Sequence, residues 1–293
     1  MVILSRGMCG LSKCVTRYLV AMAAADLLVV ITDLILRQIP IAHHLYFVQR
    51  IPLCNIHAVL LYAATDRSVW FTVTFTFDRF VAICCQKLKT KYCTEKTAAM
   101  VLVTVTLLSF LKSIFWYFMY VPWYTLSNTH WFCYVSALVM VSDLWATLEL
   151  LHYILNPCIP FVLILLLNAL TIRHILVASR ARRRLRDHSS EGIPSDIEME
   201  RRMKSIILLL VISWNFIMLW AVFLFFSIWN RILHLGYDII HVSYYIKEIG
   251  FMLQLLSCCT NTYIYAMTQS KFREQLKNVV KCPFFFIVKI IKR

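Results

Sequence analysis

Six apolar stretches, each long enough to cross a lipid bilayer, constrain this chain more than any other feature of its sequence. The hydrocarbon core of a bilayer is about 30 Å thick, and a helix needs about 20 mostly apolar residues to cross it. Stretches of this kind occupy residues 17–36, 53–80, 98–120, 146–172, 204–229 and 244–268. They are too long for strands, and the alternating pattern of a membrane β-barrel is missing. The sequence therefore predicts an all-α membrane protein built as a helix bundle.

The composition fits this class and argues against an enzyme. Hydrophobic residues make up 60% of the 293 residues and charged residues 15%, whereas soluble domains have about 25% charged residues. The five glycines are too few for the glycine-rich loops that hold phosphates. The sequence also lacks the HExxH and GxSxG motifs, so we predict that the protein is not an enzyme.

The positive charges predict how the helices are oriented in the membrane. Twenty-four of the 30 Lys and Arg residues lie in four segments, at 6–17, 79–96, 173–204 and 271–293. Because cytoplasmic segments are enriched in Lys and Arg, these segments and both chain ends are predicted to lie in the cytoplasm, as expected for a multi-pass protein of the plasma membrane. The net charge of +15 then reflects topology and contact with anionic lipids, and it indicates no nucleic-acid partner.

The segment between the fourth and fifth listed stretches is the largest predicted cytoplasmic region. Residues 180–186 are rich in Arg and are expected to continue the preceding helix. Residues 188–200 contain Ser, Gly, Pro and acidic residues, which predict a loop. The region is long enough to contact a partner, and it is equally suited to anchoring on anionic lipids.

The two ends of the chain carry further expectations. Residues 1–7 resemble the last turns of a preceding span that runs into a short basic loop, so we expect an upstream helix to be missing. They are too short for a secretory signal. Residues 281–293 are predicted to form a cytoplasmic tail, and Cys282 lies where palmitoylation would attach it to the membrane. Alternatively, Cys282 is a free thiol.

Two of the eleven cysteines are placed for the outer side of the membrane. Cys54 begins the 53–80 stretch, and Cys133 lies in the long segment 121–148, which has no Lys or Arg. A disulfide between them would hold that segment over the bundle, and the outer compartment is oxidising. The alternative is two free thiols.

A series of motifs follows the order of a known membrane family. The 53–80 stretch ends in Asp78-Arg79-Phe80, and Cys54 lies 25 residues before Arg79. The other matches are the 22–26 segment that ends in Asp26, Pro160, the region around Trp220, Asn261 with Tyr265, and the segment 271–276. In these motifs the chain resembles the rhodopsin-class (class A) G-protein-coupled receptors. It is most similar to the orphan group typified by probable G-protein-coupled receptor 139.

The resemblance implies a seven-transmembrane receptor bundle that spans residues 1–280, lacks its first helix, has six complete spans and ends in a short amphipathic eighth helix. Such a receptor binds an extracellular small molecule or peptide in the outer half of the bundle and activates a heterotrimeric G protein. The residues implied in coupling and switching are Asp78, Arg79, Phe80, Trp220, Asn261 and Tyr265. Val222 and Thr262 stand where the family normally has prolines, which puts the usual bending of two helices in doubt.

The resemblance also implies two sites inside the bundle. Asp26, Ser68, Ser257 and Asn261 would offer oxygen ligands to a sodium ion. Alternatively, a protonated Asp26 is hydrogen-bonded to Asn261 without an ion. The ligand pocket would be lined by Leu61, Tyr62, Thr65, Asp66, Glu149, His152, Trp220, Phe223, Leu224 and Phe251. Leu61 stands where amine receptors have an aspartate, which disfavours a monoamine ligand.

Asp66 and Arg67 are adjacent charges inside the 53–80 stretch. Neighbouring helix residues point about 100° apart, so each charge is expected to need partners from other helices. We expect Asp66 to face the ligand pocket, with Asp33, Glu149 and His152 as candidate neighbours. Alternatively, Arg67 is a tolerated substitution that is paired within the bundle or extends towards the membrane surface.

Two other functions remain open at this point. A six-span transporter or channel subunit would also have both ends in the cytoplasm, although the sequence lacks the re-entrant loop or paired broken helices expected of one. A truncated receptor isoform that does not signal is the second. Arg202 stands where the family often has an acid that pairs with the equivalent of Arg79, so we predict a resting state that is weakly closed.

Overall fold

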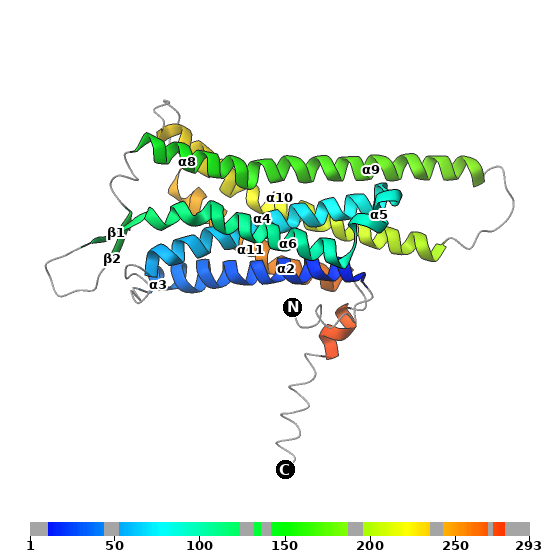
Figure 1. Cartoon of the computed structure of the whole chain (residues 1–293), viewed down its shortest axis with the longest axis horizontal. Coiled ribbons are helices and arrows are strands. Elements are labelled where there is room, and N and C mark those ends of the chain that lie inside the picture. Colours follow the sequence, from blue (N-terminus) through cyan, green and yellow to red (C-terminus); the bar gives the residue numbers. More distant parts are fainter. Residues whose placement is uncertain are drawn as a thin grey trace, which may run out of the picture.

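The structure is a computed structural model that describes residues 11–43, 53–123, 132–135, 142–186, 196–234, 243–268 and 272–278. These residues form long helices that lie side by side along one axis, with a small hairpin at one end (Figure 1). The elements are α2 Lys13–Val29, η1 Val30–Gln38, α3 Ile39–Ala42, α4 Leu53–Cys84, α5 Gln86–Tyr92, α6 Glu95–Ser113, η3 Ile114–Phe118, β1 Tyr120–Trp123, β2 Phe132–Val135, α8 Asp143–Tyr153, η4 Ile154–Cys158, α9 Ile159–Arg186, α10 Asp196–His234 and α11 Tyr244–Thr268. The all-α bundle predicted from the sequence is confirmed.

Four helical segments are long and apolar enough to cross a membrane. They are Lys13–Gln38, Glu95–Phe118, Asp143–Arg180 and Ile206–Asn230. The other two predicted stretches coincide with α4 and α11, which have the length of a span but are not among the four segments apolar enough to cross a membrane. In α4 the polar character comes from two Asp-Arg pairs, at 66–67 and 78–79, so the charges of this helix need partners inside the bundle.

Short polar residues begin several of the helices. Ser12 accepts a hydrogen bond from the Val15 amide at 3.4 Å before α2, and Thr94 accepts one from the Thr97 amide at 3.2 Å before α6. Ser142 does the same for Trp145 before α8. These side chains satisfy amides that have no partner in the first turn of a helix, which fixes where each helix starts.

The loop predicted at residues 188–200 is shorter than expected. Helix α10 already begins at Asp196, so the last five residues of the predicted loop are helical. Acidic residues in a first turn interact favourably with the partial positive charge of a helix N-terminus. The acidic residues at the end of the predicted loop therefore belong to the start of α10. Arg202 also lies within α10, and its side chain is outside the described residues.

Helix α8 does not run straight into α9. The backbone of Asn156 has φ −154° and ψ 97°, far from helical values, and Pro157 follows it. A proline lacks the amide hydrogen of a helical bond and crowds the preceding turn, so the helix breaks at this place. The break lies beside Pro160, the residue predicted to mark this helix, which is the second residue of α9.

The interior of the bundle is apolar, and so is much of its outer surface. A cluster that includes Leu19, Phe75 and Leu209, each with no exposed surface, joins α2, α4 and α10. On the outside, Leu107 is 59% exposed and Leu144 is 71% exposed. Large apolar side chains on the outer faces fit a bundle that is surrounded by lipid.

The hairpin caps the end of the bundle at which α4 begins (Figure 1). Its strands β1 and β2 pair antiparallel, with Tyr120 opposite Val135 and Pro122 opposite Cys133. No strand was predicted in this segment from the sequence. Cys54, at the start of α4, is disulfide-bonded, but the side chain of Cys133 is outside the described residues. The Cys54–Cys133 pairing therefore stays a prediction.

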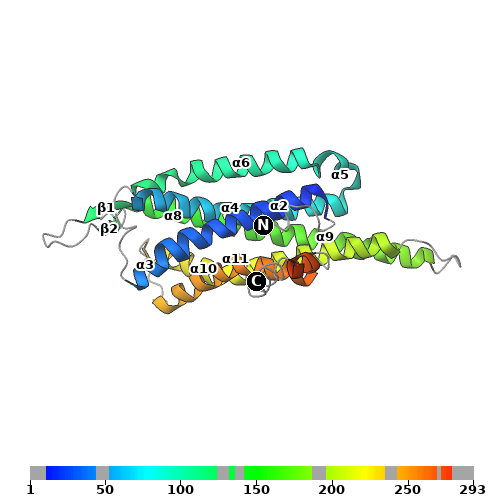
Figure 2. The same cartoon turned by 90° about the horizontal axis from the view of Figure 1, so that it is seen from below.

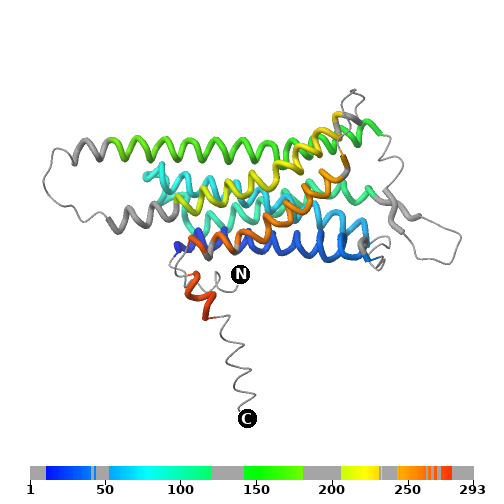
Figure 3. The backbone as a smooth tube through the Cα atoms, turned by 180° about the vertical axis from the view of Figure 1, so that it is seen from behind, coloured from blue at the N-terminus to red at the C-terminus, as the bar shows by residue number. Residues whose placement is uncertain are grey.

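The opposite end of the bundle, called here the Arg79 end, contains helix α5 and the start of α2 (Figure 1). Residues 272–278, within and after the predicted eighth helix, are helical and turn away from the bundle axis (Figure 3). Phe272 is only 4% exposed and packs into the cluster around Leu19. Residues 1–10 and Cys282 are outside the described residues.

Candidate functional site

At the Arg79 end, a buried ion pair joins two neighbouring residues of α4. The Arg79 guanidinium donates from Nε to Asp78 Oδ2 at 3.0 Å, and its Nη2 forms an ion pair with the same oxygen. Asp78 is 5% exposed and Arg79 is 9% exposed. The arginine is therefore held back against α4. Phe80, the third residue of the motif, is half-buried.

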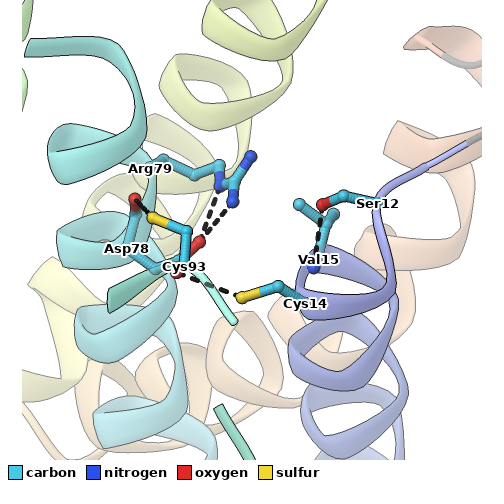
Figure 4. A network of polar contacts seen from close by, with 6 residues as sticks. All are labelled: Ser12, Cys14, Val15, Asp78, Arg79 and Cys93. Carbon is cyan, nitrogen blue, oxygen red and sulfur yellow. Dashed lines mark hydrogen bonds and ion pairs between the residues drawn. The ribbon is translucent and has the colours of Figure 1, made fainter. Parts of the chain in front are cut away.

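Two cysteines support Asp78 from other segments, and the sequence analysis missed both. The Cys14 thiol of α2 donates to Asp78 Oδ1 at 3.2 Å, and the Cys93 thiol, in the connection between α5 and α6, donates to the Asp78 carbonyl oxygen at 3.5 Å (Figure 4). Burial, together with the charge of Asp78, raises the pKa of the Cys93 thiol to about 11. Cys93 is therefore protonated at neutral pH and can act as a donor.

In the middle of the bundle, Asp26 collects hydrogen bonds from two helices. Ser68 Oγ of α4 donates to Asp26 Oδ1 at 2.6 Å, and Asn261 Nδ2 of α11 donates to Asp26 Oδ2 at 2.6 Å. Ser257, also predicted for this site, is buried one turn before Asn261, and its carbonyl oxygen accepts from Thr260 Oγ1 at 3.0 Å. The structure thus brings Asp26, Ser68 and Asn261 into direct contact, with one carboxylate at the centre.

Aromatic residues of α10 and α11 lie between Asp26 and the hairpin end. Trp220 is 2% exposed, and its ring centroid is 5.3 Å from Phe216 and 6.3 Å from Phe223. Phe223 continues the contact to Phe251, at 4.9 Å between centroids. Displacement of Phe223 would therefore act directly on the packing of Trp220, and displacement of Phe251 would act on it through Phe223. Tyr265 is part of α11, but its side chain is outside the described residues.

A cavity of about 320 Å³ opens among the helices towards the hairpin end. Four of the residues predicted for the ligand pocket line it: Leu61, Tyr62, Glu149 and Phe223. A smaller cavity of about 50 Å³ shares part of this lining and reaches deeper. It adds four more predicted residues: Thr65, His152, Trp220 and Phe251. Leu224 lines neither of these cavities.

The cavity also has charged lining that the sequence analysis did not include. Arg37 of η1 lines both cavities, and its Nη2 lies 2.5 Å from Asp33 Oδ1. Its guanidinium carbon is 4.9 Å from the centre of the Phe251 ring, and Lys247 Nζ is 5.8 Å from the same ring. Asp33 and Arg37 are spaced i and i+4, the spacing at which helical side chains meet, and this signal could have revealed the pair.

The structure places Asp66 outside the cavity, contrary to expectation. Asp66 is fully buried, and its Oδ1 accepts a hydrogen bond from Asn156 Nδ2 at 2.5 Å. Its Oδ2 lies 2.6 Å from Lys112 Nζ of α6, although not along a hydrogen-bond direction. Asp66 therefore joins α4, α6 and η4. Lys112 is the one charged residue of the mostly apolar 98–120 stretch, and it was not recognised from the sequence as a partner of Asp66.

Arg67 points away from its neighbour Asp66. Its Nε donates to the Ala63 carbonyl oxygen at 3.0 Å, and its guanidinium carbon is 4.7 Å from the centre of the Phe110 ring. The two charges thus have separate partners.

The arrangement combines a cavity at one end, an Asp-Arg pair at the other and a polar centre between them. The family model for the 7 transmembrane receptor (rhodopsin family) matches residues 2–265. The chain belongs to this family. Its helices and this membership make it a multi-pass membrane protein with the general role of the rhodopsin family, which is signalling by receptors.

The chain matches the family model although it lacks the two prolines expected at positions 222 and 262. Val222 lies in an α10 that is helical from Asp196 to His234, and Thr262 lies in an α11 that is helical from Tyr244 to Thr268. In these two rhodopsin-family helices no proline interrupts the backbone bonding.

Proposed function

We propose that this chain is a receptor that binds an extracellular small molecule or peptide in the cavity at the hairpin end and activates a heterotrimeric G protein at the Arg79 end. The observation that carries the proposal is the buried Asp78–Arg79 pair, which lies at the opposite end of the bundle from the cavity. The proposed orientation puts the hairpin outside the cell and the Arg79 end and the C-terminus in the cytoplasm, in agreement with the positive charges.

The contacts between the two ends suggest how binding would be transmitted. A ligand in the cavity would contact Phe223, which packs on Trp220 and Phe251. A ligand shifts the equilibrium between two states only by its difference in affinity for them. A ligand that fits an altered packing of these rings would therefore favour an open state, in which α10 moves at the Arg79 end and Arg79 leaves Asp78.

We also propose that Asp26 can hold a sodium ion in the resting state. Asp26, Ser68, Ser257 and Asn261 would be the ligands, and their oxygen atoms suit a hard cation. The present contacts of Asp26 with Ser68 and Asn261 equally support the alternative, a hydrogen-bonded carboxyl group without an ion. Stabilisation of the purified protein by Na⁺, but not by the larger choline cation, would favour the sodium site.

The proposed coupling can be tested without knowing the ligand. Nucleotide exchange by purified G proteins is measured on membranes that contain the full chain, with empty membranes as the baseline. Arg79→Ala should reduce ligand-independent exchange to the baseline, because the proposed contact with the G protein is lost. Arg17→Ala is the matched control, since Arg17 lies at the same end but its side chain is 58% exposed and pairs with Glu95 at the surface.

Exchange at the baseline for the unmodified chain, with every G-protein class, would contradict the proposal. It would favour the alternative of a receptor that does not signal, in which the helices lacking prolines at Val222 and Thr262 are too stiff to open. The similarity to the orphan group typified by probable G-protein-coupled receptor 139 remains part of the proposal, and it leaves the ligand open.

A further inference from the structure

A second hollow lies on the side of the bundle, away from the cavity at the hairpin end. It is a groove of about 320 Å³ between α2, α4 and α6, three helices that lie beside one another (Figure 2). Its walls are formed by small and apolar residues, which include Ala21, Ala24, Ala25, Phe71 and Leu102. Val103 and Leu107 on its rim are 58% and 59% exposed. In a membrane, this groove opens towards the lipid.

Arg67 is the one charged residue among the described residues that line the groove. Its Nε is bonded to the Ala63 carbonyl oxygen, but no carboxylate of the described chain forms an ion pair with its guanidinium. Asp66 is already paired with Lys112. The three neighbouring charges therefore sum to +1 inside the membrane, and the groove has a charge that an anion would balance.

The depth of Arg67 limits which anion can reach it. Helix α4 has 32 residues, or about 48 Å, against a hydrocarbon core of about 30 Å. Ala63 lies about 15 Å along the helix from its first residue. If α4 is centred in the bilayer, the guanidinium lies on the order of 6 Å inside the hydrocarbon on the hairpin side. A phospholipid phosphate stays in the headgroup layer, whereas a single-chain amphiphile can sink to this depth.

We propose that the groove between α2, α4 and α6 binds a fatty acid, with the carboxylate on Arg67 and the acyl chain along the apolar walls towards the Arg79 end. The planar guanidinium has two further nitrogen atoms that match the two oxygens of a carboxylate. The alanines of α2 leave room for the chain. The Thr106 hydroxyl donates to the Leu102 carbonyl oxygen at 2.7 Å, so the remaining wall offers little to a polar tail.

The proposal is tested by photolabelling of the full chain in phosphatidylcholine nanodiscs. The probe is palmitic acid with a photoreactive diazirine and an alkyne tag, and labelled peptides are identified by mass spectrometry. We expect labels within residues 21–28 and 102–107. Oleate should compete at least tenfold more strongly than methyl oleate, because the ester has the same chain but no charge to pair with Arg67.

Two variants separate the charge from the shape of the groove. Arg67→Met should abolish the preference for oleate over its methyl ester, and Ala24→Trp should remove the labelling by filling the groove. Leu166→Trp is the control, since Leu166 is 53% exposed on α9, away from the groove. If Arg67→Met does not fold, the Ala24→Trp variant and the comparison of oleate with methyl oleate still test the proposal.

Equal competition by oleate and methyl oleate would overturn the proposal and indicate an apolar occupant such as a phospholipid acyl chain. Labels outside the groove, or labelling unchanged by Ala24→Trp, would overturn it as well. The measurement records binding rather than signalling, so its outcome is independent of the proposed receptor function.

Discussion

Helix α4 contains the dipeptide Asp-Arg twice, at 66–67 and at 78–79, and the two copies differ in which residues their side chains contact. At Asp78–Arg79 the arginine folds back and pairs with its own neighbour. At Asp66–Arg67 the two side chains separate, since Asp66 binds Lys112 and Asn156 while Arg67 binds the Ala63 carbonyl. The surrounding helices make the difference. Lys112 offers Asp66 a second cation. The neighbours of Asp78 from other segments are the Cys14 and Cys93 thiols, and a thiol cannot replace an arginine as a counter-ion.

The difference suggests two roles for the same pair of residues. Asp66 has partners on two other segments. Its ion pair with Lys112 holds α4 to α6, and its hydrogen bond from Asn156 holds α4 to η4. Asp78 has its cation on the same helix, so releasing Arg79 breaks no ion pair between helices. The second arrangement suits a switch, and the first suits a fixed contact.

The largest effect is expected from Lys112→Met, which leaves Asp66 buried without a cation. Removing one partner of a buried ion pair costs about 3 to 5 kcal/mol, and the apparent melting temperature of the detergent-solubilised protein should fall by about 10 °C. Adding Asp66→Asn should restore much of the loss, because the unpaired charge is then gone. Lys87→Met, at an exposed position, is the control. Unchanged melting in Lys112→Met would contradict the role given to Asp66.

A smaller effect, on signalling, is expected from Asp78→Asn. The variant removes the charge that holds Arg79, so basal nucleotide exchange per receptor should rise about threefold, which corresponds to roughly 0.6 kcal/mol in the equilibrium between closed and open states. Asp66→Asn, the same change at the other pair, should leave exchange per receptor unaltered. If both variants raise exchange equally, the distinction between a switch and a fixed contact fails.

The smallest effect concerns the chemistry of Cys93. Because the pKa of its thiol is raised to about 11 and only the thiolate is nucleophilic, alkylation by iodoacetamide should be slow at pH 7.5. Its rate should rise about tenfold per pH unit up to that pKa. Asp78→Asn removes a nearby negative charge, so it should lower the pKa and speed the reaction, although burial remains. Mass spectrometry of the Cys93 peptide measures the rate. A rate that stops rising by about pH 9, near the ordinary pKa of a thiol, would exclude a raised pKa.

Much of the fold could be predicted from local sequence, because a helix in a membrane must satisfy its own backbone. All six apolar stretches are mainly helical, although the 146–172 stretch breaks at Asn156, and the motif residues Asp26 and Trp220 are buried. The hairpin was not predicted, since its strands are held by pairing across a turn rather than by a pattern in either segment. The start of α10 was also misplaced, because acidic residues suit both a loop and a helix N-terminus.

The sequence alone predicted which segments enter the membrane and in which orientation they cross it, because the transfer of apolar and charged residues into lipid depends on each segment separately. Through the order of the motifs, it also identified eight residues that line the two cavities. Only the tertiary structure decided where the buried charges go. Asp66 is 46 residues from Lys112 and 90 from Asn156, and an ion in a low dielectric takes the partner that packing brings within about 3 Å. Distance along the chain carries no information about that choice.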